Sequence, residues 1–242
     1  MHRYIDPDAL TDRQRYKLFS GAIVPRPIAL ITTVSTGGVV NAAPYSFFNV
    51  MGNDPPVVCI GIGPKRGDLK DTGTNIRRTG QFVVNLVSED TVQAMNITAI
   101  DVDPGVDELA MAKLTPLAST AIAPPRIAES PVALECERLA VVDLGNGRAV
   151  VMGKVLAMHV RDDCLDAQGR YVNPDVYQPI ARLHADNYIV ADRQFVLAKP
   201  AAMDRHEAAQ LVPAPADAPA ATSAATSAAA PLPTPLRRQE TR

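Results

Sequence analysis

The sequence predicts a mainly β fold, a β-barrel with a few short peripheral helices, and three observations support this prediction. At least six segments are rich in β-branched and apolar residues, and turn residues separate several of them. These segments do not alternate with long helical ones, as they would in a parallel α/β sheet. The sequence also has no GxGxxG motif after a strand and no GxxxxGK[ST] motif, which argues against a Rossmann or P-loop nucleotide site.

Two turn signals organise the predicted strands into hairpins. Gly37-Gly38 separates two β-rich runs, and Asn146-Gly147 is the pair that a type I′ hairpin turn prefers. The predicted strands cover residues 28–34, 39–43, 57–62, 81–87, 131–136, 139–144, 149–159 and 188–190. Many strands joined by short turns are typical of a barrel.

The first predicted helix lies before the strands. Thr11 and Gln14 form a capping-box pattern, so we expect a helix from Asp12 to about Phe19 that Gly21 terminates. The prolines at 25 and 27 then force an extended backbone.

Three further short helices are expected between the strands. Asp71-Thr72 is expected to cap a helix that ends at Gly80, because Asp and Thr side chains accept hydrogen bonds from the first helical N–H groups. A second helix is expected from the 88–91 segment to about Ile97, and a third over residues 106–113.

Composition limits the classes of partner and the compartment. The 242 residues carry a net charge of −2, so no basic surface for nucleic acid or an anionic membrane is expected. Cys59, Cys136 and Cys164 are far apart and form no CxxC or Cys/His pattern, so we predict neither disulfides nor a metal site. The first ten residues lack an apolar signal core, and no apolar run reaches about 18 residues. We therefore expect a cytoplasmic protein without membrane segments.

The last forty residues differ from the rest in composition. Residues 203–242 consist largely of Ala, Pro, Ser and Thr and have few residues that could build a core. We predict that this tail is disordered and that residues 1–202 form a single domain.

Polar side chains gather in three patches where predicted strands end. The first holds Arg26 with Thr32 and Thr33, the second covers residues 41–49, and the third covers residues 70–75. Hydroxyls, backbone N–H groups, a helix start and a lysine are what a phosphate group requires. Small residues and amides are what the flat isoalloxazine ring of a flavin requires. The patches together are therefore compatible with a flavin mononucleotide.

The same patches carry a resemblance to a known family. The motifs are PRPIALITT (25–33), NAAPYSFF (41–48), DPP (54–56), KDTGTNI (70–76), FVVN (82–85) and LEC (134–136). In this order, over about residues 15–195, they closely resemble the flavin reductase-like, FMN-binding split-barrel family. The resemblance implies a Greek-key-like split β-barrel, a homodimer with FMN near the subunit interface, and hydride transfer from NAD(P)H to the flavin N5.

The resemblance also implies the residues of the cofactor site. The candidate cofactor-binding residues are Arg26, Thr32, Thr33, Asn41, Ala43, Tyr45, Ser46, Lys70, Thr72 and Asn75. Lys70, Thr72 and Asn75 are expected near the phosphate or ribityl chain. Thr32 and Thr33 cannot both face the same side of a strand, and Arg26 could equally be a surface arginine on a rigid turn. No catalytic side chain is expected because the flavin carries the redox chemistry, with His184 as one candidate for the active-site lining.

One departure from the family pattern leaves several hypotheses open. Family members often have two glycines after an Arg-Leu pair, whereas this chain has His184-Ala185 after Arg182-Leu183. The first hypothesis is an NAD(P)H-dependent flavin oxidoreductase that supplies a separate monooxygenase, a metal complex or another protein. The second is an FMN-binding electron carrier without a nicotinamide site. The third is a flavin-free scaffold whose tail recruits partners.

Overall fold

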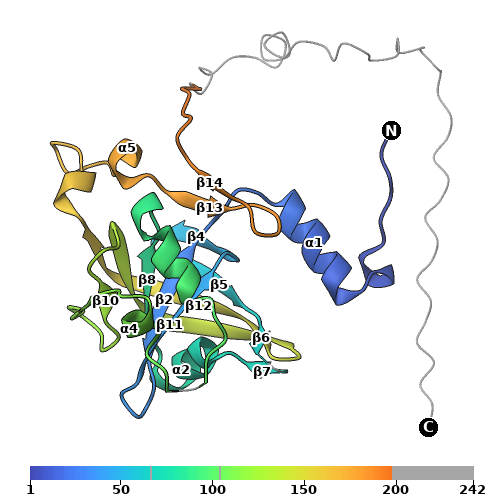
Figure 1. Ribbon diagram of the computed structural model, residues 1–242, viewed down its shortest axis with the longest axis horizontal. Helices are drawn as coiled ribbons and strands as arrows, with labels where there is room; N and C mark the ends of the chain where they lie inside the picture. Colours follow the sequence, from blue (N-terminus) through green and yellow to red (C-terminus); the bar gives the residue numbers. More distant parts are fainter. Residues whose placement is uncertain (66, 104, 198–242) are drawn as a thin grey trace. The chain divides into compact units, whose positions relative to one another are not determined.

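The computed structural model describes residues 1–65, 67–103 and 105–197 (Figure 1). Residues Met1–Gln194 form one compact unit. The predicted disordered tail, residues 203–242, lies outside the described residues. The predicted mainly β fold is confirmed, because a seven-stranded sheet whose neighbouring strands are all antiparallel dominates this unit.

The large sheet has the strand order β3-β2-β8-β11-β12-β5-β4. Its strands are β2 (Ala29–Val34), β3 (Val40–Tyr45), β4 (Phe48–Asn53), β5 (Pro56–Ile62), β8 (Gln81–Leu86), β11 (Val132–Gly145) and β12 (Arg148–Val160). The smaller sheets consist of β1 (Arg26–Pro27), β13 (Ile180–Arg182) and β14 (Tyr188–Val190); β6 (Pro64–Lys65) and β7 (Asp68–Leu69); and β9 (Pro116–Leu117) and β10 (Arg126–Ile127).

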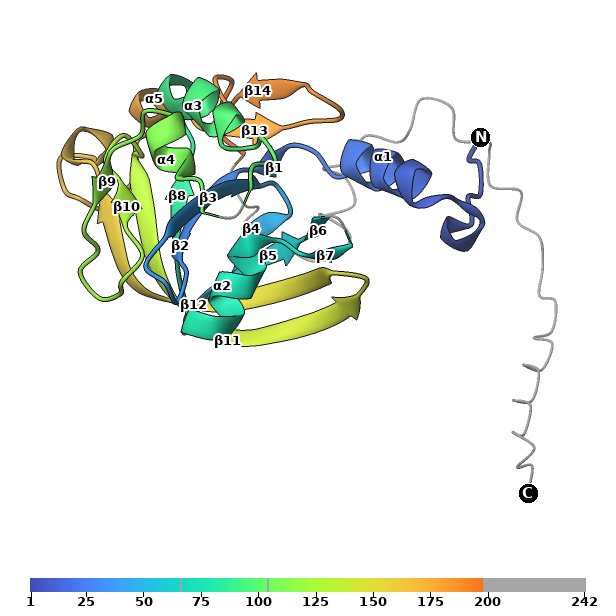
Figure 2. The same cartoon turned by 60° about the horizontal axis from the view of Figure 1, so that its bottom comes forward.

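The connection between β3 and β4 shows that the large sheet must curl. These strands form its two opposite edges, yet only Ser46 and Phe47 separate them in the chain. A flat sheet of seven strands would be about 29 Å wide at about 4.8 Å per strand, whereas a two-residue connection spans about 11 Å at most. The sheet therefore curves until its edges approach each other, as Figure 2 shows. The sequence prediction missed β4, whose Asn- and Gly-containing sequence has weak β propensity.

The hairpin of β11 and β12 extends beyond the rest of the sheet. Its pairing runs from Val132 opposite Val160 to Gly145 opposite Arg148. Asn146 and Gly147 both have positive φ angles, as the predicted type I′ turn requires. The two strands predicted over residues 131–144 are one continuous strand that begins at Val132, and register shifts take the place of a break.

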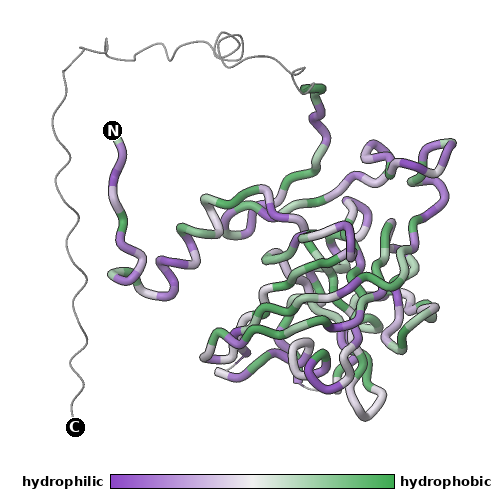
Figure 3. Tube along the Cα trace, turned by 180° about the vertical axis from the view of Figure 1, so that it is seen from behind, coloured by the Kyte–Doolittle hydropathy of each residue, from purple (hydrophilic) through white to green (hydrophobic). Residues whose placement is uncertain are grey.

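Apolar side chains from the large sheet fill the barrel interior, and Figure 3 shows long hydrophobic runs along these strands. Phe82 lies at the centre of this core and is fully buried. Gly153 leaves the space that the ring occupies, because a Cβ atom at Gly153 would lie 2.3 Å from the Phe82 Cζ atom. A second cluster between the sheet and α3, which includes Met95, covers the other side of β2.

Short helices connect the strands: α1 (Asp12–Ala22), α2 (Asp71–Thr79), α3 (Val92–Ile97), α4 (Glu108–Met111) and α5 (Pro174–Tyr177). Thr11 and Gln14 form the predicted capping box of α1, but the helix continues past Gly21 to Ala22. Lys70, and not Asp71 or Thr72, is the residue that precedes α2. Within the described residues, no helix is both long and apolar enough to cross a membrane.

Candidate functional site

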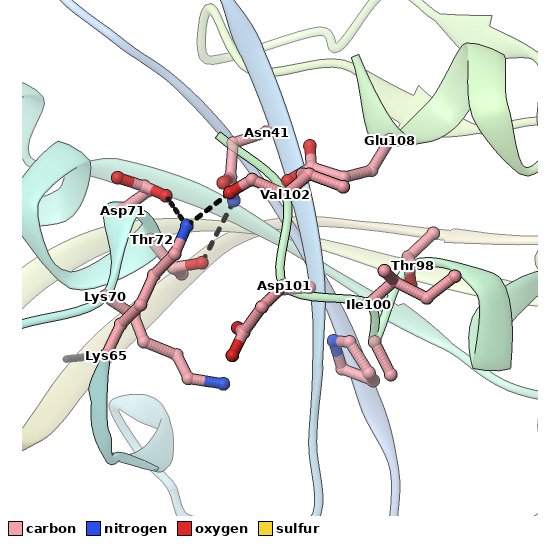
Figure 4. A pocket seen from close by; sticks show the side chains of 13 residues that line it. Asn41, Lys65, Lys70, Asp71, Thr72, Thr98, Ile100, Asp101, Val102 and Glu108 are labelled. Carbon is pink, nitrogen blue, oxygen red and sulfur yellow. Dashed lines mark hydrogen bonds and ion pairs between the residues drawn. The ribbon is translucent and has the colours of Figure 1, made fainter. Parts of the chain in front are cut away.

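A cavity of about 70 Å³ lies at the N-terminal end of α2 (Figure 4). Strand β3, the start of α2 and the segment 98–102 enclose it. Four of the predicted site residues line it, namely Asn41, Ala43, Lys70 and Thr72. The structure therefore brings the second and third polar patches of the sequence together.

The start of α2 offers unsatisfied hydrogen-bond donors to this cavity. Lys70 occupies the N-cap position, and no side chain accepts a hydrogen bond from the first N–H groups of the helix. The N-terminal end of a helix carries a partial positive charge, which favours an anion there. In the described part of the chain Lys70 forms no ion pair, and Figure 4 shows its ammonium group extending into the cavity. This end of α2 is therefore suited to a phosphate group.

Tyr45 adds a buried hydroxyl beside the same helix start. Its side chain is 6% exposed, and among the described residues it is the one buried side chain whose polar atom has no hydrogen-bond partner. Burial raises the pKa of the Tyr45 phenol well above its ordinary value, so the group remains a neutral donor. An unpaired buried hydroxyl is costly, which suggests that a bound ligand completes its hydrogen bonding.

The cavity also carries acidic side chains, of which the sequence prediction named Asp71 only as a helix cap. Lys65 donates to the Asp71 carboxylate at 2.8 Å and to the Val102 carbonyl at 2.7 Å. Glu108 accepts a hydrogen bond from the Ala42 N–H at 3.0 Å, and burial raises the pKa of its carboxyl group. No local motif could reveal the Glu108–Ala42 contact, because the two residues are 66 positions apart.

Two amide–hydroxyl pairs link α2 to the sheet. Asn41 donates to the Thr72 hydroxyl, and Asn75 donates to the Thr33 hydroxyl, each at 3.0 Å. Thr33 and Asn75 thus lie next to the cavity and position the helix. Thr32 is not brought to this cavity, because its side chain is on the other face of β2.

The hydroxyl of Thr32 belongs to a separate network at the barrel end. It donates to the Pro125 carbonyl at 2.5 Å and accepts from the Asn85 amide at 3.2 Å. Asn85 also accepts a hydrogen bond from the Ile127 N–H at 2.9 Å. These bonds hold the segment before β10 against the sheet, which is a structural role.

Ser46 directly follows β3 and lies about 17 Å from Asn41, at about 3.4 Å per strand residue. Arg26 lies beside Ser46 and is therefore at a similar distance from the cavity. The buried Arg26 guanidinium donates to the Ile23 carbonyl at 3.0 Å, to the Leu183 carbonyl at 2.9 Å and to the Ser20 carbonyl. It also lies 3.4 Å from the Ser46 hydroxyl. Arg26 therefore satisfies carbonyl groups at the C-terminal end of α1 and links them to the β13–β14 connection.

His184 lies in that connection and is exposed. Its Cβ atom faces Gly21 of α1, and its carbonyl accepts a hydrogen bond from the Asn187 N–H. Ala185 has a φ of 48°, the left-handed region that favours glycine. Ala185 stands where the family pattern has its second glycine, and it retains the backbone conformation that favours glycine.

The donor set at the start of α2 fits the phosphate end of a flavin nucleotide. It combines free helix N–H groups, the Lys70 ammonium and the Thr72 hydroxyl, which line the cavity, with the unpaired hydroxyl of Tyr45, a neighbour of Lys70 that does not line it. Ala43 and Pro44 line the adjoining part of the cavity with small, flat surfaces. Among the described residues, the charged side chains that line this cavity are Lys65, Lys70, Asp71, Asp101 and Glu108.

Comparisons with known proteins place the chain among flavin-related proteins. Residues 20–179 match the family model described as a flavin reductase like domain. The structure is similar to that of nitrilotriacetate monooxygenase component B from Bacillus cereus, with 35% sequence identity, a TM-score of 0.77, and coverage of 81% of this chain and 99% of that one. It is also similar to the 2-nitrobenzoate 2-nitroreductase NbaA of Pseudomonas fluorescens, with 36% identity, a TM-score of 0.76, and coverage of 84% and 98%.

A third solved structure defines the fold. It comes from Shewanella frigidimarina, is described as a flavin reductase with a split barrel domain, and has 23% identity and a TM-score of 0.71 over 80% of this chain and 96% of that one. The family model covers well over half of the chain. The fold is therefore a split barrel, and the chain belongs to the flavin reductase-like family of flavin-related oxidoreductases.

Proposed function

We propose that this protein binds FMN and acts as an NAD(P)H-dependent flavin oxidoreductase. The observation that carries the proposal is the start of α2, where helix N–H groups without a capping side chain, the Lys70 ammonium and the Thr72 hydroxyl line one cavity, and where the Lys70 ammonium lies 6.0 Å from the centre of the Tyr45 ring. A phosphate group would satisfy all three kinds of donor at once.

The charges around the cavity support FMN as the flavin, in preference to FAD. Asp71, Asp101 and Glu108 line the same cavity as Lys70, and Asp71 already engages Lys65. One phosphate can pair with Lys70 and the helix start, whereas a second phosphate and an adenosine would meet these carboxylates. Like charges at close range disfavour binding, so the acidic wall supports a mononucleotide as the ligand.

Each residue of the site has a role in holding the cofactor. Lys70, Thr72 and Tyr45 bind the phosphate, and the Asn41–Thr72 and Asn75–Thr33 hydrogen bonds fix the helix that presents them. Ala43 leaves room for the flavin to lie along β3 toward Ser46. The bound flavin supplies the redox chemistry, accepting hydride from the nicotinamide and passing electrons onward.

The proposal includes a second copy of the chain and an acceptor protein. An apolar groove of about 530 Å³, whose lining includes Val50 and Met158, lies on the barrel surface. Such a surface supports a homodimer, since monomers rarely expose large apolar areas. A neighbour named as a monooxygenase component supports a separate monooxygenase as the acceptor of reduced flavin.

Spectroscopy tests the proposal directly. Purified protein titrated with FMN, FAD and riboflavin should bind FMN most tightly, and anaerobic addition of NADH or NADPH should bleach the flavin absorption. Equal affinity for riboflavin and FMN would contradict the phosphate site. Unchanged absorption after both nicotinamides would contradict the reductase activity.

A second candidate function is an FMN-binding electron carrier without a nicotinamide site. The replacement of two family glycines by His184 and Ala185 favours it, because the His184 side chain adds volume beside Gly21 of α1. Stopped-flow mixing of FMN-loaded protein with each nicotinamide separates the two functions. A fast response supports the reductase, and a slow or absent response supports the carrier.

A further inference from the structure

A second cavity, of about 620 Å³, lies at the far end of β12 from α2. Strand β12 starts at the turn near β7 and α2 and ends at Val160 (Figure 2). Residues of β10 and of the segment 165–172 line the cavity at this end of the strand. Its lining combines three cationic or imidazole side chains with an apolar wall. The lining residues are Arg126, Met158, His159, Val160, Leu165, Gly169, Arg170, Tyr171 and Val172.

The two arginines of this cavity have no carboxylate partner within the described residues. Arg126 donates one hydrogen bond, to the Ala118 carbonyl at 3.3 Å, and Arg170 donates to the Gln168 amide oxygen at 3.4 Å. Elsewhere in the chain, Arg15, Arg77 and Arg161 pair with aspartates at the surface. The guanidinium groups at this cavity therefore remain able to bind an anion.

Two acidic residues close in sequence to the cavity lining already accept hydrogen bonds or form an ion pair. Asp166 accepts hydrogen bonds from the backbone N–H groups of Arg170 and Tyr171 at 2.6 and 3.1 Å. Asp163 pairs with Arg161. Within the part of the chain that the structure describes, no acidic side chain lines the cavity, and Arg126 and Arg170 give it a positive charge.

A buried carboxylate fixes the orientation of His159. Glu135 is fully buried and accepts hydrogen bonds from the Thr120 N–H at 2.7 Å, the Ala121 N–H at 2.6 Å and the His159 Nε2 atom at 2.6 Å. Burial alone would raise the pKa of Glu135, but these hydrogen bonds outweigh it and lower the pKa. Since a carboxylate only accepts, Nε2 carries the proton, and Nδ1 has no partner among the described residues.

The remaining lining provides an apolar and aromatic surface. Met158 and Tyr171 are 56% and 71% exposed, and the Arg170 guanidinium lies 6.0 Å from the centre of the Tyr171 ring. An aromatic ring can pack on Met and Tyr side chains, while guanidinium groups bind a carboxylate with matching planar geometry.

We propose that this cavity binds a small aromatic carboxylate, with Arg126 and Arg170 holding the carboxylate and Tyr171 contacting the ring. The site lies at the opposite end of the β11–β12 hairpin from the flavin cavity and does not depend on the proposed flavin function. A substrate of the acceptor reaction and an effector of the protein would be recognised by the same chemistry, that of an aromatic acid.

Titration of the isotope-labelled full chain with benzoate, benzamide and acetate, followed by two-dimensional NMR, tests this proposal. Benzoate should shift the amide signals of residues 158–160 and 169–172 in a saturable manner. Benzamide, which lacks the charge, and acetate, which lacks the ring, should each bind at least about fivefold more weakly.

Substitution of each arginine completes the test. Arg170→Gln, at an exposed position, and Arg126→Gln should each weaken benzoate binding by about fivefold or more, while Arg13→Gln on the exposed face of α1 should leave it unchanged. Flavin affinity should stay the same in all three variants, which separates this proposal from the flavin assignment. Shifts confined to other residues, equal binding of benzamide, no saturable shift, or unchanged affinity in the arginine variants would overturn it.

Discussion

The N-terminal ends of α1 and α2 show two different uses of the same structural element. Thr11 and Gln14 satisfy the first donors of α1, and Arg15 pairs with Asp12 in its first turn. At α2 the N-cap residue is Lys70, and no side chain accepts from the first N–H groups. A lysine at an N-cap is unfavourable for the helix by itself, because it repels the positive end of the helix dipole.

This difference indicates that α1 is built for stability and α2 for an anionic ligand. The Lys70 ammonium, which has no ion pair among the described residues, lies 6.0 Å from the centre of the Tyr45 ring at this helix start. Capping residues at α2 would therefore stabilise the flavin-free protein and compete with the ligand. Four experiments test this comparison, in order of decreasing expected effect.

The largest effect is expected for Lys70→Asp. An aspartate removes the cation, adds a negative charge and can cap the helix, so the affinity for FMN should fall by about 100-fold. The free energy of unfolding of the flavin-free protein should rise by about 0.5 to 1 kcal/mol. Fluorescence titration and chemical denaturation measure the two effects, with riboflavin as the matched ligand without a phosphate. Unchanged FMN affinity would show that α2 does not bind the phosphate.

Tyr45→Phe removes only the unpaired hydroxyl. FMN affinity should fall roughly tenfold if the hydroxyl donates to the ligand. The stability of the flavin-free protein should not fall, because the hydroxyl has no partner to lose. Thermal unfolding with and without FMN separates the two effects. A loss of more than about 1 kcal/mol without flavin would contradict the absence of a partner for this group.

Thr11→Ala tests the other helix. Loss of the capping hydroxyl should lower the free energy of unfolding by about 1 kcal/mol and leave FMN affinity unchanged. Thr11→Ser, which retains the hydroxyl, serves as the control in the same denaturation experiment. A parallel loss of flavin binding would show that the two helix starts are coupled.

The smallest expected effect is on the pH dependence of stability, to which one acidic residue near each helix start contributes. Burial raises the pKa of Glu108, so the folded protein holds this proton more tightly than the unfolded chain does. Wild type should therefore gain stability relative to Glu108→Gln as the pH falls toward about 4.5, and lose that gain as the pH rises through the raised pKa, by less than about 1 kcal/mol.

The exposed acid at α1 provides the matched control for this pH dependence. The hydrogen bond and charge of Arg15 lower the pKa of Asp12, so the effect of Asp12→Asn should have the opposite sign. The free energy of unfolding of the wild type should increase relative to that of Asp12→Asn as the pH rises. Denaturation experiments between acidic and neutral pH measure the slope of this difference for both variants. Parallel slopes for the two variants would contradict the contrast between the helix starts.

Most of the fold followed from local sequence signals. The Thr11–Gln14 capping box and the Asn146-Gly147 turn involve residues at most three positions apart, and the structure contains both. The expected cap at Asp71-Thr72 was wrong, because Asp71 instead pairs with Lys65. The stop at Gly21 was also wrong, since α1 continues through this position to Ala22.

The sequence by itself determined which residue types meet the needs of a flavin phosphate, and it determined a β-rich chain with short capped helices. Only the tertiary structure decided which of those residues share a cavity. Curling of the sheet places Asn41 beside Thr72 and Ala42 beside Glu108, across 31 and 66 positions of the chain. The physical reason is that caps and turns are set by neighbouring residues, whereas a binding cavity is set by the order in which distant strands pair.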